Sequence, residues 1–180
     1  AHGAAGQRRG GEPLSPEARA GRALIKVGYA CNNSCVFCHS EGSAPPRSQS
    51  ALVESKIEKA AALGATMVVF SGGEPTLRTE LPAWARRARG LGLPVGLITN
   101  GRMLSYPRLL EALHRGGLSY AQVSLHSGYE SVHDKITRAA GSFQQTMMAA
   151  LGLHALGVDV TVNAVVTRAN LDTLEEVVER

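Results

Sequence analysis

Short apolar runs alternate with longer stretches of helical periodicity from Ala23 to the end of the chain. Each run is bounded by polar, glycine or proline residues and is too short for a buried helix, so each predicts a strand. The five predicted strands are residues 24–29, 67–70, 95–99, 121–126 and 158–166. The segments between them predict helices, except that residues 127–141 are expected to form mainly a long loop.

Helix-starting and helix-ending residues mark the predicted helices. The first covers residues 51–63 and ends at Gly64. Thr79 is predicted to cap a second helix, and Ser105 or Tyr106 begins a third, which Gly116-Gly117 ends. Ser142-x-x-Gln145 predicts a capping box for the fourth, and Asp172-x-x-Glu175 begins a fifth.

Two of these helices have predicted apolar faces. The first carries Leu52, Ile57, Ala60 and Leu63 near helical spacing. The fourth carries Met148, Leu151 and Ala155, and its methionines are interpreted as core residues rather than ligands.

Five strand–helix units in order predict an α/β fold with a parallel sheet and right-handed crossovers. The chain has 180 residues, whereas a closed eight-unit barrel needs about 250. A partial open (β/α) barrel fits better. A doubly wound sheet is the alternative, but its glycine-rich turn would follow the first strand, where this chain has cysteines. The chain begins with Ala1 and ends at Arg180 inside an apparent helix, which indicates a fragment cut after about five units.

Composition narrows the class of protein. Residues 1–22 are rich in glycine, alanine and arginine and predict a disordered or loosely attached tail, which leaves 23–180 as one core domain. The net charge of +4 is too mild and scattered to indicate nucleic-acid binding. No run is long enough to span a membrane, and no signal peptide is evident. Unpaired cysteines favour a reducing cytoplasm.

The three cysteines of the chain, Cys31, Cys35 and Cys38, lie in one C-x3-C-x2-C segment. Three thiolates on a short loop suit an iron–sulfur cube, whose irons take cysteine ligands. A four-iron cluster would then keep one iron open for another ligand, as catalytic metals keep a vacant position.

Two other interpretations compete with a cluster. A disulfide scaffold would need an even and dispersed set of cysteines. Zinc is the serious rival, because His39 would complete a Cys3His set. Structural zinc sites usually draw on two separated ligand pairs, however, and the chain has no second pair.

Polar or glycine-rich residues follow every predicted strand, where parallel α/β folds place their active sites. They are the cysteine loop, Ser71-Gly72-Gly73-Glu74-Pro75, Thr99-Asn100-Gly101, Ser124 with His126-Ser127, and Thr161 with Asn163. The paired glycines would let a ligand approach the backbone, and Glu74 would face a ligand ammonium. On the fourth strand, Ser124 and His126 share a polar face that is predicted to look into a solvated interior.

The cysteine spacing and Gly72–Pro75 together resemble the signature of the radical S-adenosylmethionine (SAM) superfamily, over about residues 24–180. The resemblance implies a six-unit partial barrel, so at least one strand would be missing. It also implies a [4Fe-4S] cluster on Cys31, Cys35 and Cys38 and a SAM molecule chelated to the open iron. The GGEP segment Gly72-Gly73-Glu74-Pro75 would hold the methionine amine.

By the same resemblance, other residues acquire expected roles. Phe37 would lie near adenine, Ser124 would contact the ribose or carboxylate of SAM, and Asn163 would lie on the SAM side. Thr99 and Asn100, from a TNG segment, would face substrate or SAM. His126 is either a substrate contact or a satisfied polar residue. Arg78 either meets an anionic group or is a solvated charge, and His133-Asp134 is interpreted as loop structure.

The implied function is an oxygen-sensitive radical SAM enzyme. Its reduced cluster would cleave SAM to a 5′-deoxyadenosyl radical that abstracts hydrogen from an unknown substrate. A flavodoxin or ferredoxin would donate the electron. GGEPTLR and TNG resemble the branch that contains molybdenum-cofactor and peptide-modifying enzymes, which suggests a small-molecule or peptide substrate. The alternatives are a zinc-binding interaction domain and a metal-independent barrel enzyme acting on a phosphorylated ligand.

Overall fold

The computed structural model describes residues 21–38 and 49–179. Within that part, five strands form one fully parallel sheet. They are β1 (Arg22–Lys26), β2 (Met67–Ser71), β3 (Val95–Thr99), β4 (Leu118–Ser124) and β5 (Asp159–Asn163). Their spatial order is the chain order, β1-β2-β3-β4-β5.

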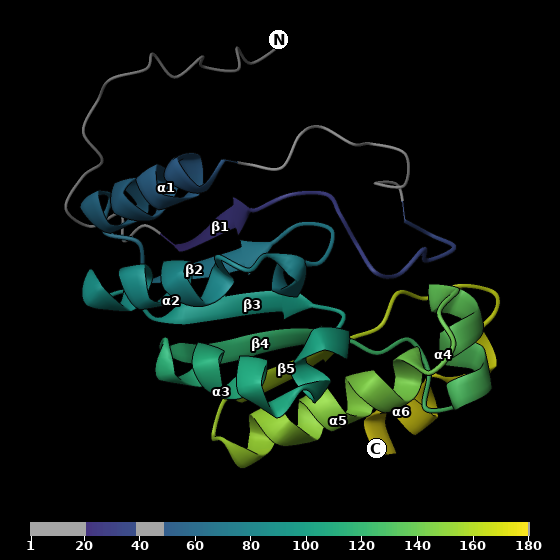
Figure 1. Ribbon diagram of the computed structural model, residues 1–180. Helices are drawn as coiled ribbons and strands as arrows, with labels where there is room; N and C mark the ends of the chain where they lie inside the picture. Colours follow the sequence, from purple (N-terminus) through teal and green to yellow (C-terminus); the bar gives the residue numbers. More distant parts are fainter. Residues whose placement is uncertain (1–20, 39–48, 180) are drawn as a thin grey trace, which may run out of the picture.

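Helices connect the strands and pack mainly on one face of the sheet. They are α1 (Ser50–Ala62), α2 (Leu81–Gly90), α3 (Pro107–Arg115), α4 (Glu130–Thr137), α5 (Ser142–Ala155) and α6 (Glu175–Glu179). Short 3-10 turns cover Pro75–Leu77, Arg102–Ser105 and Leu171–Thr173. Figure 1 shows α1, α2, α3 and α5 side by side along the sheet. None of the described helices is long and apolar enough to cross a membrane.

The strand order decides between the two predicted architectures. A right-handed crossover to the next strand always places its helix on the same side, so an unreversed order puts all helices on one face. A doubly wound sheet instead reverses its strand order and has helices on both faces. The observed sheet is therefore an open arc of a (β/α) barrel, as predicted.

Strand boundaries differ from the prediction at every strand except β3. Residues 95–99 are predicted and observed alike as β3. The first strand begins at Arg22, inside the predicted tail, and ends at Lys26 rather than Tyr29. The fourth and fifth strands end at Ser124 and Asn163, so His126 lies beyond its strand. The predicted tail and His39 otherwise fall outside the described residues.

Two predicted helix caps are wrong. Helix α2 begins at Leu81, and the Thr79 hydroxyl contacts Glu80 instead of capping. Ser142 is the first residue of α5 rather than its cap, and its hydroxyl contacts Asp134. Asp134 takes over the capping role by accepting hydrogen bonds from the backbone N–H groups of Gly141 and Phe143. A side chain from the preceding helix has replaced the local capping box.

Residues 127–141, predicted as a long loop, contain helix α4. The helix is short and polar, so its sequence pattern is weak, and tertiary contacts stabilise it. The α4 side chains of His133 and Ile136 are buried, and Asp134 of the same helix accepts a hydrogen bond from Ser142 of α5. The interpretation of His133-Asp134 as loop structure is therefore wrong.

The core lies between the sheet and the helix layer, and the predicted helix faces are partly out of phase. Helix α1 buries Val53, Ile57 and Ala60, whereas Leu52 and Leu63 are exposed. Helix α5 buries residues Phe143, Ala149 and Leu153. Met148 and Leu151 are exposed, so the prediction of a methionine-bearing core face is wrong. The inner face of α5 thus combines two large apolar residues with the smaller Ala149 and Thr146.

Candidate active site

A cavity of about 220 Å³ opens at the carboxyl ends of the strands. It brings together most residues that the sequence singled out. Its lining comprises Cys31, Asn33, Cys35, Phe37, Cys38, Gly72, Gly73, Ile98, Thr99, Asn100, Ser124, His126, Asn163 and Val165. Glu74 and Pro75 are buried and do not line it. The cysteine loop, the paired glycines and the polar ends of β3, β4 and β5 therefore share one site.

The cysteine loop is fixed by backbone hydrogen bonds to helix α4. The N–H groups of Ser34 and Val36 donate to the carbonyls of Thr137 and Ile136, at 3.0 and 2.9 Å. These carbonyls belong to the last turn of α4, where helix carbonyls lack partners within the helix. Helix α4, which the sequence did not predict, thus supplies the carbonyl groups that hold the cysteine loop in place.

Gly72 and Gly73 are needed because two backbone segments meet there. A Cβ on Gly73 would lie 2.3 Å from the Tyr29 carbonyl oxygen, and one on Gly72 would lie 2.4 Å from that of Gly28. Gly73 N–H donates to Gly28 O, and Glu74 N–H donates to Ala30 O. The space left by the missing Cβ atoms is thus occupied by the chain that leads into the cysteine loop, although both glycines also face the cavity.

Glu74 braces the ends of β2 and β3. Its side chain is only 2% exposed. One carboxylate oxygen accepts from the backbone N–H and hydroxyl of Thr76 and from the Thr99 hydroxyl, and the other accepts from Asn100 N–H at 2.7 Å. Burial raises the pKa of Glu74, and these hydrogen bonds oppose the shift. The carboxylate is therefore engaged within the protein, rather than facing the cavity as the sequence suggested.

Ser124 and Asn163 are register partners at the ends of β4 and β5, and both line the cavity. The expected alternation along β4 is seen, because Ala121 and Val123 are buried while Gln122 and Ser124 are partly exposed. The two polar side chains present neutral hydrogen-bonding groups to whatever occupies the cavity.

His126 is buried, in contrast to the solvated position expected for it. Its ring lies edge-on to the Phe37 ring, with 4.9 Å between the ring centroids, and stacks on the His133 ring, with 5.6 Å between the centroids. Burial and, secondarily, His133 lower the pKa of His126 to about 4, and burial lowers that of His133 to about 4. His126 Nδ1 accepts from Val165 N–H, which leaves the proton of the neutral ring on Nε2.

Arg78 is buried beside the first strand rather than solvated. It donates to the Val27 carbonyl at 2.5 Å, pairs with Glu80 at 2.8 Å and lies over the Trp84 ring. Its hydrogen bond lowers the pKa of Glu80 to about 2. Arg78 therefore supports the fold behind the cavity and does not line it.

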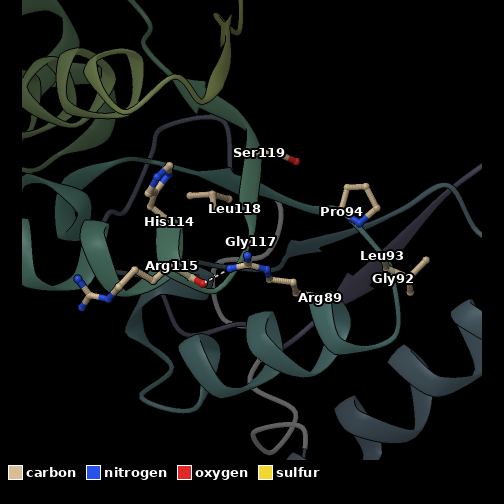
Figure 2. Close-up of a pocket in the computed structure, with 9 residues that line it drawn as sticks. All are labelled: Arg89, Gly92, Leu93, Pro94, His114, Arg115, Gly117, Leu118 and Ser119. Atoms are coloured by element: carbon tan, nitrogen blue, oxygen red, sulfur yellow. Dashed lines mark hydrogen bonds between the residues drawn. The ribbon is translucent and has the colours of Figure 1, made fainter.

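A larger hollow of about 690 Å³ lies at the opposite, amino ends of β3 and β4 (Figure 2). Its lining includes Arg89, His114 and Arg115, from the ends of α2 and α3. Arg89 donates to the Arg115 carbonyl at 2.6 Å. Basic side chains at helix C-termini commonly satisfy terminal carbonyls, and no residue with a predicted chemical role lies here. The smaller cavity is thus the candidate site.

The thiols fit an iron–sulfur cluster by their chemistry and placement. All three cysteines are free and face the same cavity. Burial, and after it the neighbouring thiols of Cys31 and Cys38, raise the pKa of Cys35 to about 11, so a metal must displace its proton. Among the described residues, no three His, Cys, Asp or Glu side chains are gathered to hold a single metal ion. A cube has a different requirement, because each thiolate binds a separate iron.

Comparison with known proteins agrees with this site. The model of the Radical SAM superfamily matches residues 25–180. PqqA peptide cyclase of Ruegeria pomeroyi is 33% identical over 159 residues, which cover 87% of this chain and 42% of that protein. The Gluconobacter oxydans PqqA peptide cyclase is 34% identical over 156 residues, or 85% and 43%. The chain spans less than half the length of these relatives.

Solved structures show the same fold. Streptococcus suis SuiB bound to S-adenosylmethionine has a TM-score of 0.74 at 19% identity, with 88% of this chain and 37% of that chain covered. Native anSMEcpe with bound AdoMet has a TM-score of 0.66 at 19% identity, with coverages of 88% and 47%. Because the family match includes both the cysteine loop and Gly72–Pro75, this chain belongs to the radical SAM superfamily, whose enzymes use a [4Fe-4S] cluster and SAM.

Proposed function

We propose that this protein reductively cleaves SAM and uses the product radical to remove a hydrogen atom from a substrate. The observation that carries the proposal is the convergence of three free thiols with Gly72, Gly73, Ser124 and Asn163 on one cavity. When bound, the cluster would supply the electron that splits SAM into methionine and a 5′-deoxyadenosyl radical.

The chain's own residues would bind and orient these groups. Cys31, Cys35 and Cys38 would each ligate one iron. The Gly72–Gly73 backbone, which lines the cavity together with the thiols, would receive the methionine end of SAM. Ser124 and Asn163 would hydrogen-bond the ribose or carboxylate, and Phe37 would lie against the adenine. Thr99 and His126 would face the remaining volume, where burial limits access of water.

We propose a peptide as the substrate class. Two of the relatives are named PqqA peptide cyclases, and one SuiB structure is described as bound to the precursor peptide SuiA. A flavodoxin or ferredoxin would reduce the cluster in a reducing, cytoplasmic setting, which the three free cysteines also favour.

The test is anaerobic reconstitution of the purified protein with iron and sulfide. We expect about four irons per chain and, after reduction, formation of 5′-deoxyadenosine from SAM. Cys35→Ala should abolish both results. Ser34→Ala is the matched control, because Ser34 contributes its backbone N–H to the loop and this group remains. A protein that retains one zinc and never cleaves SAM would overturn the proposal.

A further inference from the structure

Asn100 makes an unexpected set of contacts with the cysteine loop. Its side-chain Nδ2 donates to Asn32 Oδ1 at 2.7 Å and approaches the Cys31 sulfur at 3.8 Å, within hydrogen-bonding range for sulfur. Its Oδ1 accepts from Arg102 N–H at 3.0 Å. The amide N–H groups are therefore directed at the loop, although the TNG resemblance had suggested a substrate or SAM contact.

The surrounding contacts fix this amide in place. The Asn100 backbone N–H donates to buried Glu74, and the Thr146 hydroxyl of α5 donates to the Asn100 carbonyl at 2.8 Å. Both bonds hold the backbone that carries the side chain. The orientation of the amide consequently does not depend on the loop alone.

Arg102 holds the loop residues that Asn100 contacts. Its Nη1 donates to the Asn32 carbonyl and to Asn33 Oδ1, while Nε donates to Gln145 Oε1 at 2.7 Å. These acceptors carry no charge, so the guanidinium is not held by an ion pair with them. It is held by several hydrogen bonds from its planar, rigid set of donors. Arg102 thereby secures the segment between Cys31 and Cys35 against α5.

We propose that Asn100 is a redox-tuning residue, whose amide N–H donates to the Cys31 sulfur and favours the reduced cluster, with Arg102 as the positioning residue. This inference rests on the proposed function, because it needs a cluster on Cys31. Reduction adds negative charge to the cluster and its thiolates, so an N–H donor to sulfur strengthens on reduction. Asn33 N–H donates to the same sulfur at 3.4 Å and would act alongside it.

The test compares Asn100→Ala with Asn32→Ala in the reconstituted protein. Asn32→Ala removes the side-chain bridge between the two residues but leaves the Asn100 donor to sulfur. Iron content and visible absorption first establish that each variant carries the cluster. Electron paramagnetic resonance then measures the amount of reduced cluster at one fixed solution potential, and comparison with the total cluster gives the ratio of reduced to oxidised cluster.

We expect Asn100→Ala to lower this ratio on the order of threefold, the value of one modest hydrogen bond, and Asn32→Ala to leave it nearly unchanged. Asn100→Ser, whose side chain is too short to reach the sulfur, should repeat the loss if the alanine variant loads poorly. Equal shifts in the Asn100 and Asn32 variants would show that the amide only supports the loop and would overturn the proposal. Failure of the wild-type protein to take up a cluster would instead refute the proposed function.

The positioning role of Arg102 has its own readout. Arg102→Lys keeps the charge but cannot reproduce the fork to two loop acceptors and Gln145. We expect faster iron loss to a chelator from this variant, together with a lower reduced-to-oxidised ratio. An unchanged ratio and unchanged iron loss would contradict the assignment.

Discussion

The two hollows at opposite ends of the sheet differ in what surrounds them. The hollow at the amino ends is about 690 Å³ and is lined by tight turns and helix C-termini, with Gly92 and Gly117 at positive φ. The cavity at the carboxyl ends is about 220 Å³ and contains the thiols and the polar strand ends. In a parallel sheet the chemistry follows strand direction, because the loops after the strands converge at one edge. Volume alone would have selected the wrong end.

The loops at the carboxyl ends also contact one another over long sequence distances. The cysteine loop reaches α4 through Ser34 and Val36, and Arg102 connects it to Gln145. At the amino ends, the Arg89–Arg115 hydrogen bond joins the C-terminal ends of two neighbouring helices (Figure 2). Substitutions at the carboxyl ends should therefore cost more than matched substitutions at the amino ends.

The largest expected contrast is between Gly73→Ala and Gly92→Ala. A Cβ at Gly73 would collide with two backbone carbonyls, and neither can move without displacing the cysteine loop. We expect a loss of about 4 kcal/mol in unfolding free energy and loss of SAM binding. Gly92 has φ +78° but nothing within 4 Å, so its variant should lose only about 1 kcal/mol. Urea denaturation measures both values, and similar losses would contradict the contrast.

The second effect is a pH dependence from the buried histidines of the carboxyl-end site. In the unfolded chain, His126 and His133 have an ordinary pKa near 6.5, whereas in the folded protein the pKa of each ring is about 4. Stability should therefore be unaffected by these groups above about pH 6.5 and fall as pH drops toward 4, by roughly 3 kcal/mol per ring at most.

Denaturation of the wild-type protein and of His126→Gln at several pH values tests this expectation. The variant should show a shallower decline over the same interval, because it lacks one of the two titrating rings. Parallel pH profiles for the two proteins would assign the decline to other groups.

A smaller contrast compares two carboxylates that are changed to amides. Glu74→Gln would place its NH₂ group against the backbone N–H of either Thr76 or Asn100, and both of these groups can only donate. We expect a loss of about 2 kcal/mol and weaker SAM binding. Glu111→Gln, which breaks an exposed ion pair with Arg115 at the other end, should cost about 0.5 kcal/mol or less. Thermal unfolding measures both losses of stability. If Glu74→Gln cost no more than Glu111→Gln, the hydrogen bonds of Glu74 would not stabilise the ends of β2 and β3 as proposed.

The last prediction concerns Arg89→Ala, which should leave the carboxyl-end site unaffected. It removes one hydrogen bond to the Arg115 carbonyl and should reduce stability by about 1 kcal/mol or less. SAM affinity of the reconstituted protein, measured by titration calorimetry, should stay unchanged. A tenfold loss of SAM affinity would show that the amino-end hollow is energetically coupled to the cavity at the carboxyl ends.

Sequence reasoning succeeded where a signal was local or periodic. The central strand β3 was predicted residue for residue, and the ordered series of strand–helix units predicted the open barrel. It failed for α4, whose polar sequence carries little periodicity, and for the two caps. The Thr79 hydroxyl contacts the adjacent Glu80, and Asp134 of the preceding helix caps α5 in place of Ser142. The apolar phase of α5 was misjudged because Phe143, Ala149 and Leu153, rather than Met148 and Leu151, are buried on its inner face.

The sequence by itself determined the donor set, three thiols in C-x3-C-x2-C and a glycine pair one strand–helix unit further along, since these are properties of residue type and spacing. Only the tertiary structure decided how that set is held. It placed the Glu74 carboxylate inside the protein, turned Asn100 toward Cys31 and set α4 under the cysteine loop. These contacts join residues up to about a hundred positions apart, and their geometry depends on the packing of the whole sheet and its helices, which no local pattern encodes.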